Sequence, residues 1–186
     1  MIDNTIKIVI GSWGSYNACN EKALGSKWLN LSDYTTWEEI TDELKREGFD
    51  LNGIDEELFI QDIEGIMSDS ANWDYISPKT LFETLYESGV LNDEYKYEVM
   101  NAYLEICNFD EFEELVNNKG DRWDEDIYLY KDYDWEDYGR AVFEDCGFDA
   151  EVPEELQDFF NFESYGRSHG ECVAHEYSGG LIEIFR

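Results

Sequence analysis

Carboxyl groups are the most abundant side chains of this sequence that could do chemistry, with 45 Asp and Glu among 186 residues. A glycosidase needs two of them at a set separation, one with a raised pKa. Because the chain has so many carboxylates, no pair stands out as a catalytic dyad, and solvated helix faces are the simpler interpretation. An acidic hydrolase is therefore the least favoured of the functions considered.

Possible metal ligands occur at His169, Cys172 and His175, three residues apart. Structural zinc requires four ligands, usually as closely spaced pairs, and a strand over 171–177 would place Cys172 and His175 on opposite faces. The acidic run from Asp121 to Asp132 has the length of a calcium loop but lacks the glycine at its sixth position. We predict no specific metal site.

Motifs for phosphate binding and nucleophilic catalysis are missing from the sequence as well. It has no P-loop, no GxGxxG after the first strand-like run and no nucleophile elbow, and Gly11 and Gly14 fit turns better. We expect no cofactor, and a protein that is not an enzyme.

Cysteine usage and hydropathy indicate where the protein works. The four cysteines form no CxxC pair, and no signal-peptide pattern precedes the first strand-like run. These features predict reduced thiols and a cytoplasmic location. No apolar stretch approaches the roughly 20 residues that a membrane helix needs, so we predict no membrane role.

The N-terminal third of the chain reads as mixed structure. Lys7 to Ile10 has the pattern of an opening strand, and a second apolar run follows at Trp28 to Leu31. Thr36 and Glu39 form a capping-box pattern before a helix that ends near Gly48. Residues 58–63 alternate as a strand would, with a short helix as the alternative.

The middle of the chain is predicted to be helical throughout. Ser77-Pro78 begins a helix that ends at Gly89. Two more helices follow, over Asn92 to about Ile106, with Tyr95, Val99, Tyr103 and Ile106 buried, and over Asn108 to about Val116.

Mixed structure returns in the last third. Residues 126–131 alternate as a strand, Asp134 caps a helix that runs to Gly147, Pro153 opens a short helix, and 171–177 and 181–185 form a hairpin pattern. The fold class is therefore α+β, with mixed ends around a helical middle. The predicted domains are 1–75, an N-terminal α+β domain; 76–120, a helical middle domain; and 121–186, a C-terminal α+β domain.

Composition predicts a folded polyanion. Acidic disordered segments cannot bury enough apolar surface to fold, whereas this chain has 11 Phe, 13 Tyr and 6 Trp. Its formal charge of −32 is regional, with 0 over residues 1–35, −11 over 36–78, −7 over 79–120, −13 over 121–163 and −1 over 164–186. Selection for solubility or high salt would acidify all segments alike, so this pattern favours a long acidic face.

A surface with this much negative charge would repel nucleic acid. B-DNA carries one charge per about 1.7 Å of its axis, so 32 charges correspond to roughly 54 Å, or about sixteen base pairs. Carboxylates placed where phosphates would be could enter a basic DNA groove, so a DNA mimic is one hypothesis for this charge, beside solubility, adaptation to high salt and drift in composition. The alternative is an acidic adaptor or chaperone that shields another basic DNA-binding protein.

Several C-terminal motifs carry a family resemblance. They are Val152-Pro153-Glu154-Glu155-Leu156, the run from Phe159 to Arg167 (FFNFESYGR) and Gly180-Leu181-Ile182-Glu183-Ile184. At the other end, Tyr16-Asn17, the Leu24-Gly25 to Trp28 spacing and Phe59-Ile60-Gln61-Asp62 agree with the same family. On these residues, the chain resembles the ArdA antirestriction family.

The resemblance implies a DNA mimic that binds the DNA channel of type I restriction-modification enzymes, contacts their modification and specificity subunits, and inhibits them competitively. It also implies an elongated homodimer, with three small domains per subunit, that spreads on mobile genetic elements. The C-terminal domain mediates dimerisation in the family, so we place Phe159, Phe160 and Tyr165 at the dimer interface. Arg167 is expected to hold a carboxylate or carbonyl inside the fold, with contact to a partner protein as the alternative.

We expect the outward carboxylates of residues 36–74, of the helix at 110–114 and of residues 121–137 to act together as phosphate surrogates. We name this set the acidic surface: Glu38, Glu39, Asp42, Glu43, Asp62, Glu64, Asp69, Asp74, Asp110, Glu111, Glu113, Glu114, Asp121, Asp124, Glu125, Asp126, Asp132, Asp134, Glu136 and Asp137.

Overall fold

A computed structural model describes residues 5–66 and 73–185, without the side chains of Asp74 and Glu154. Contacts between Cα atoms divide the chain into two compact units, Met1–Trp123 and Asp124–Arg186. Each unit combines helices with a small antiparallel sheet, which confirms the α+β class. Among the described residues, no helix is long and apolar enough to cross a membrane. The division of the first unit into two domains stays a prediction.

The first unit begins with a three-stranded sheet in the order β2-β1-β3. Its strands are β1 (Lys7–Ser12), β2 (Leu29–Asn30) and β3 (Leu58–Glu64), so the segment that allowed a strand or a helix is a strand. The short helix α1 (Trp13–Ala18) follows β1 directly, where the sequence predicted only a turn. Ser12 caps this helix by accepting a hydrogen bond from the backbone N–H of Ser15.

Helix α2 (Trp37–Arg46) begins at the predicted capping box. The Thr36 side chain accepts from the backbone N–H of Glu39, and the Glu39 carboxylate accepts from the backbone N–H of Thr36 in return. Ile40 and Leu44 form the buried face of the helix. Short 3-10 helices precede and follow this part of the chain at Leu31–Asp33 and Trp73–Tyr75.

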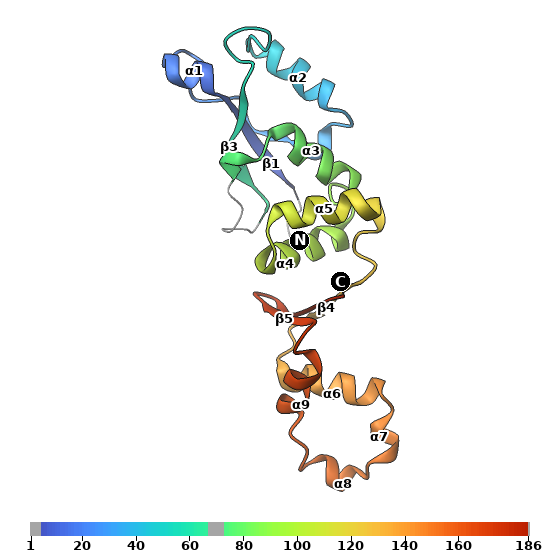
Figure 1. The fold of residues 1–186 in the computed structure, drawn as a ribbon. Coiled ribbons are helices and arrows are strands. Elements are labelled where there is room, and N and C mark those ends of the chain that lie inside the picture. The colour runs from blue at the N-terminus through green and yellow to red at the C-terminus, as the bar shows by residue number, and fades with distance from the viewer. Residues whose placement is uncertain (1–4, 67–72, 186) are drawn as a thin grey trace. The chain divides into compact units, whose positions relative to one another are not determined.

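Three helices make up the rest of the first unit (Figure 1): α3 (Pro78–Glu87), α4 (Glu94–Ile106) and α5 (Phe109–Lys119). The 3-10 helix Gly120–Arg122 then leads to Trp123, whose ring is fully buried against Phe112 with centroids 4.9 Å apart. Its indole N–H donates to the Ser88 carbonyl oxygen over 3.0 Å, so the end of the unit is anchored to the residue that follows α3.

One prediction about the core of α4 was wrong. Tyr95 is 47% exposed, whereas Tyr97 is buried and donates its hydroxyl to the Gly65 carbonyl oxygen over 2.6 Å. The helix begins at Glu94 with Asp93 as its N-cap, so its buried stripe includes Tyr97, Met100 and Leu104. Val99 and Tyr103 are buried as predicted.

The second unit has the strand order β4-β6-β5, in which β4 is Ile127–Lys131, β5 is Ala174–Tyr177 and β6 is Gly180–Ile184. Strands β5 and β6 form the predicted hairpin. The helices are α6 (Trp135–Asp145), α7 (Phe148–Glu151), α8 (Glu154–Gln157) and α9 (Phe162–Gly170). Figure 1 shows α6, α7, α8 and α9 arranged as an open ring.

Helices α6 and α9 approach closely through a pair of glycines. A Cβ atom at Gly139 would lie 2.0 Å from the Phe162 carbonyl oxygen, and one at Gly166 would lie 2.4 Å from the Trp135 carbonyl oxygen. Real Cβ atoms do not approach backbone so closely, so only glycine fits at these positions. Gly166 belongs to the Tyr165-Gly166-Arg167 run of the sequence. This run lies in helix α9, which the sequence did not predict.

Candidate acidic binding surface

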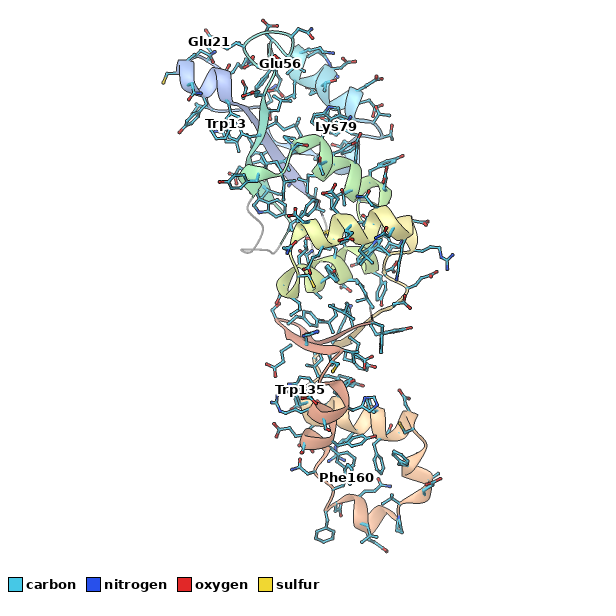
Figure 2. All side chains as sticks on the ribbon, in the orientation of Figure 1. Trp13, Glu21, Glu56, Lys79, Trp135 and Phe160 are labelled. Atoms are coloured by element: carbon cyan, nitrogen blue, oxygen red, sulfur yellow. The ribbon has the colours of Figure 1, made fainter. Side chains whose placement is uncertain are left out.

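The carboxylates of the acidic surface are exposed or partly exposed wherever the structure describes their side chains. Those that are partly exposed are Glu43, Glu111, Glu113 and Asp124. Asp69 lies outside the described residues, as does the side chain of Asp74. The formal charge is −18 for the first unit and −14 for the second, so both units are polyanions. Figure 2 shows how oxygen-tipped side chains project from the helices of each unit.

Many of these carboxylates lie at the N-terminal ends of helices. Capping boxes join Thr36 to Glu39 at α2, Asn108 to Glu111 at α5, and Asp134 to Asp137 at α6. The N-terminus of a helix offers unpaired N–H groups and a partial positive charge, so a carboxylate there stabilises the helix. This placement explains how the fold tolerates part of its charge.

The capping role also affects the pKa of one of these groups. Hydrogen bonds from the backbone N–H and the hydroxyl of Thr35, joined by the backbone N–H of Thr36, lower the pKa of Glu39 below its ordinary value. Glu39 is therefore ionised at neutral pH, but its Oε2 atom already accepts hydrogen bonds within the protein. A partner would have to compete for that atom.

A second group of acidic-surface carboxylates pairs with cations one helical turn away. Lys45 pairs with Asp42 at 2.9 Å, Arg46 with Glu43 at 2.6 Å, and Arg140 with Glu136 at 2.8 Å. The Lys45 ammonium lowers the pKa of Asp42 through a hydrogen bond and its charge. These pairs reduce the local negative charge, but because they face water they add little to stability.

The remaining carboxylates of the acidic surface are the best candidates for contact with a partner. Glu125 and Asp126 are exposed but have interactions of their own within the protein. Within the part of the chain that the structure describes, the others that are exposed, lie outside the capping boxes and form none of these ion pairs are Glu38, Asp62, Glu64, Asp110, Glu114, Asp121 and Asp132. The sequence alone did not separate them from the capping and ion-paired residues, because separation requires side-chain geometry.

Two buried carboxylates serve the fold instead. Asp55 is 2% exposed and accepts hydrogen bonds from the Ser15 hydroxyl and the backbone N–H of Asp50. Burial by itself raises the pKa of Asp55, but hydrogen bonds, chiefly from Ser15, outweigh burial and leave the pKa below its ordinary value. The carboxylate therefore joins α1 to the 50–55 turn, and it was not predicted from the sequence.

Glu183 is the second buried carboxylate, on β6. It accepts hydrogen bonds from the hydroxyls of Tyr130, over 3.0 Å, and of Tyr138. Burial raises the pKa of both tyrosines, and the neighbouring carboxylate raises it further, so both remain protonated donors. Strand β6 is thereby tied to β4 and α6.

The residues placed at a dimer interface differ in exposure. Phe159 is 86% exposed and Phe160 is 39% exposed, whereas Tyr165 is partly buried against Phe143 and Phe160. Leu156, at 58%, adds another exposed apolar side chain to the same segment. Exposed apolar side chains grouped in this way are typical of an interaction site.

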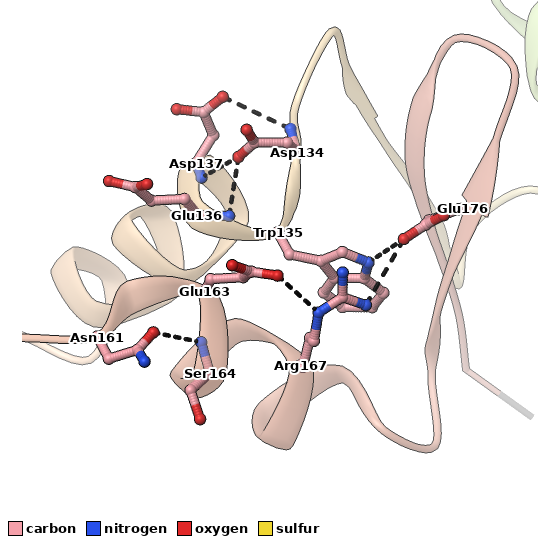
Figure 3. Close-up of polar contacts among 9 residues, drawn as sticks. All are labelled: Asp134, Trp135, Glu136, Asp137, Asn161, Glu163, Ser164, Arg167 and Glu176. Carbon is pink, nitrogen blue, oxygen red and sulfur yellow. Dashed lines mark hydrogen bonds and ion pairs between the residues drawn. The ribbon is translucent and has the colours of Figure 1, made fainter.

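The structure also places Arg167 and Cys172, the latter one of three residues considered and rejected as metal ligands. Arg167 holds two carboxylates, those of Glu163 and Glu176, but at the surface instead of inside the fold (Figure 3). Cys172 lies in the turn before β5, which begins at Ala174. Among the described residues, no group of three or more His, Cys, Asp or Glu side chains could hold a metal ion.

The fold and the surface together define an acidic α+β protein of two compact units, with carboxylates as its main exposed functional groups. The chain matches the family described as "Antirestriction protein (ArdA)" over residues 8–182, nearly its whole length. It therefore belongs to the ArdA antirestriction family, as the resemblance indicated. The family's role is interference with restriction enzymes, and its members are inhibitor proteins. A search of curated proteins found no match.

Proposed function

We propose that this protein is a DNA mimic that occupies the DNA channel of a type I restriction-modification enzyme and excludes DNA by competition. The observation that carries the proposal is the exposure of the acidic surface on both units of a chain whose formal charge is −32. Membership of an antirestriction family supplies the kind of target. No bond is made or broken in this mechanism.

The charge of each unit supports the comparison with DNA. At one charge per about 1.7 Å of duplex axis, a charge of −18 matches roughly 31 Å and a charge of −14 roughly 24 Å of B-DNA. Binding to a basic groove releases condensed counterions from DNA, and a dense carboxylate surface gains part of the same entropy. The modification and specificity subunits, which must bind DNA to recognise and methylate it, are the proposed contacts.

We further propose that the protein acts as a homodimer joined through the second unit. Support comes from the exposed apolar segment that contains Leu156, Phe159 and Phe160. A two-fold interface would bring this segment of one protomer against the same segment of its partner. Dimerisation would double the acidic surface offered to one enzyme.

The proposal is tested by neutralising acidic-surface carboxylates that neither cap helices nor pair with cations. The variant carries Glu38→Gln, Glu64→Gln, Asp110→Asn and Glu114→Gln, all in the first unit. An exposed charge pair contributes about 0.2–1 kcal/mol, so we expect the inhibition constant against a purified type I enzyme to rise on the order of tenfold to a hundredfold. Restriction and methylation are both measured.

A matched control removes the same number of charges elsewhere: Glu21→Gln, Glu56→Gln, Glu57→Gln and Glu87→Gln, all exposed residues of the first unit outside the acidic surface. We expect the control to inhibit nearly as well as the wild type. Equal inhibition by the test variant and the wild type would refute this part of the acidic surface as a contact. Capture of small basic nucleoid proteins from a lysate, without modification or specificity subunits, would favour the acidic adaptor instead.

A further inference from the structure

A pocket on the second unit combines aromatic side chains with carboxylates, two of which, Asp134 and Glu136, belong to the acidic surface. It lies where the start of α6, helix α9 and the β5-β6 hairpin meet, and its walls include the rings of Tyr133, Trp135 and Tyr177. The carboxylates of Asp134, Glu136, Glu163 and Glu176 also line it, against the single cation of Arg167. The pocket therefore combines aromatic faces with a formal excess of three negative charges.

Arg167 already occupies this pocket in the manner of a ligand. Its guanidinium carbon lies 5.0 Å from the centre of the Trp135 ring, its Nε atom is 3.1 Å from Glu163, and its Nη1 atom is 3.7 Å from Glu176 (Figure 3). The indole N–H of Trp135 donates to the same Glu176 carboxylate. One aromatic face and two carboxylates thus surround a single guanidinium group.

The contacts between the pocket and Arg167 are weak enough for another guanidinium group to displace Arg167. The side chains of Arg167, Glu163 and Glu176 are 53%, 60% and 66% exposed, so water screens both ion pairs. Trp135, by contrast, is held in place by its contact with Tyr138 and by packing on the core of the unit. The aromatic wall is fixed, and the guanidinium over it is replaceable.

From this geometry we infer that the pocket is a receptor for an arginine side chain of a partner protein, with Arg167 as an internal competitor that leaves when the partner's guanidinium enters. Arginine fits better than lysine, because a planar guanidinium stacks on an indole and can reach two carboxylates at once. An anion would be repelled by the lining charge. The inference rests on the proposed function for the source of that arginine, a basic DNA channel.

The test uses the full-length protein and a small probe, so that it does not depend on inhibition of any enzyme. N-acetyl-arginine amide is titrated into ¹⁵N-labelled protein, and the indole N–H resonance of Trp135, assigned with a Trp135→Phe variant, reports binding. N-acetyl-citrulline amide has nearly the same shape without the charge and serves as the control ligand. We expect the arginine probe to shift this resonance saturably and the citrulline probe to leave it unchanged.

Two variants separate a receptor from a merely structural ion pair. Removing the competitor in Arg167→Met is expected to strengthen binding of the probe on the order of tenfold, because one cation–π contact and two exposed ion pairs no longer oppose entry. The double variant Glu163→Gln, Glu176→Gln is expected to lose binding, whereas Glu171→Gln, an exposed acid outside the pocket, binds like the wild type.

Unchanged or weaker probe binding in a folded Arg167→Met protein would overturn the inference, as would equal shifts with citrulline. Backbone spectra of each variant show whether the second unit is folded, and a variant that unfolds is replaced by Arg167→Gln or by the single glutamate substitutions. If the probe binds as expected while the acidic surface proves irrelevant to inhibition, the pocket stands and the proposed function fails. If the probe does not bind while neutralising the acidic surface weakens inhibition, the inference about the pocket fails and the proposed function stands.

Discussion

The buried carboxylate of Asp55 gives the sharpest prediction about the first unit. Its oxygens accept from the Ser15 hydroxyl and, over 2.8 Å, from the backbone N–H of Asp50. In Asp55→Asn, one of the two side-chain oxygens becomes an NH₂ group that faces a donor, so one buried donor loses its acceptor. A buried unsatisfied group costs about 1–3 kcal/mol, and the lost charge assistance adds to it, so we expect a loss of about 2–4 kcal/mol of unfolding free energy at pH 7.

The distribution of tryptophan makes this loss measurable for the first unit alone. Trp135 is the one tryptophan of the sequence beyond residue 124, so in a Trp135→Phe background the remaining tryptophan fluorescence reports on the first unit. Urea unfolding followed by this fluorescence compares the Asp55→Asn variant with its parent in that background. A Glu56→Gln variant is the control, because Glu56 is an exposed neighbour whose amide should change stability by less than about 0.5 kcal/mol.

The pH dependence of the difference in unfolding free energy between the Asp55→Asn variant and its parent shows whether the ionised Asp55 carboxylate causes that difference. The folded-state pKa of Asp55 is lowered, so its stabilisation is fully present above the unfolded-state pKa of about 3.9 and is lost as pH falls through the folded-state pKa. The gap between the two proteins should therefore be constant from pH 7 to about pH 5 and narrow below about pH 4. A gap smaller than about 0.5 kcal/mol at pH 7, or one that widens on acidification, would refute the reasoning.

Two further predictions concern the proposed function. Inhibition should weaken steeply as salt rises from low to physiological concentration, because counterion release drives it; a flat inhibition constant across that range, measured with one enzyme preparation, would contradict DNA mimicry. Phe159→Ser, which replaces an 86% exposed ring, should raise the dimer dissociation constant by about tenfold or more in sedimentation equilibrium, with Tyr75→Ser, an equally exposed tyrosine of the first unit, as control. An unchanged dimer would remove Phe159 from the interface.

Local signals in the sequence predicted most of the helices and strands. The capping box at Thr36, the N-cap at Asp134, Pro78 at the first position of α3, and the alternation in β4 each place a specific hydrogen bond or dihedral angle within a few residues. These hydrogen bonds and dihedral angles are set by residues close together in the sequence. They could therefore be predicted without knowledge of the rest of the fold, and the structure contains them.

The elements that sequence reasoning missed depend on contacts between distant residues. Helix α9 contains Gly166, which lowers helix propensity, and it forms because this glycine packs against Gly139 of α6. Helix α1 follows β1 without a linker, and Ser15 on it is buried by its bond to Asp55, 40 residues away. Neither partner can be read from a local pattern.

The sequence predicted which carboxylates face outward, but not which of them cap helices or pair with cations. Glu38 and Glu39 are adjacent and chemically alike, yet Glu39 caps α2 and Glu38 does not. Arg167 was expected to hold its partner inside the fold, whereas its guanidinium lies over Trp135 at the surface. Charge counting cannot make these distinctions, because they follow from side-chain direction.

The division between capping carboxylates and those outside the caps and ion pairs has a consequence for how such a protein can change over generations. A capping residue such as Asp134 or Glu39 is constrained by a hydrogen bond inside its own helix, so its replacement lowers stability whatever the target enzyme. A residue such as Glu114, exposed beyond the first turn of α5 and outside the capping boxes, has no such constraint. Mutations can therefore move acids along such positions freely and redraw the pattern presented to new restriction enzymes, while the helix ends keep the fold that displays it.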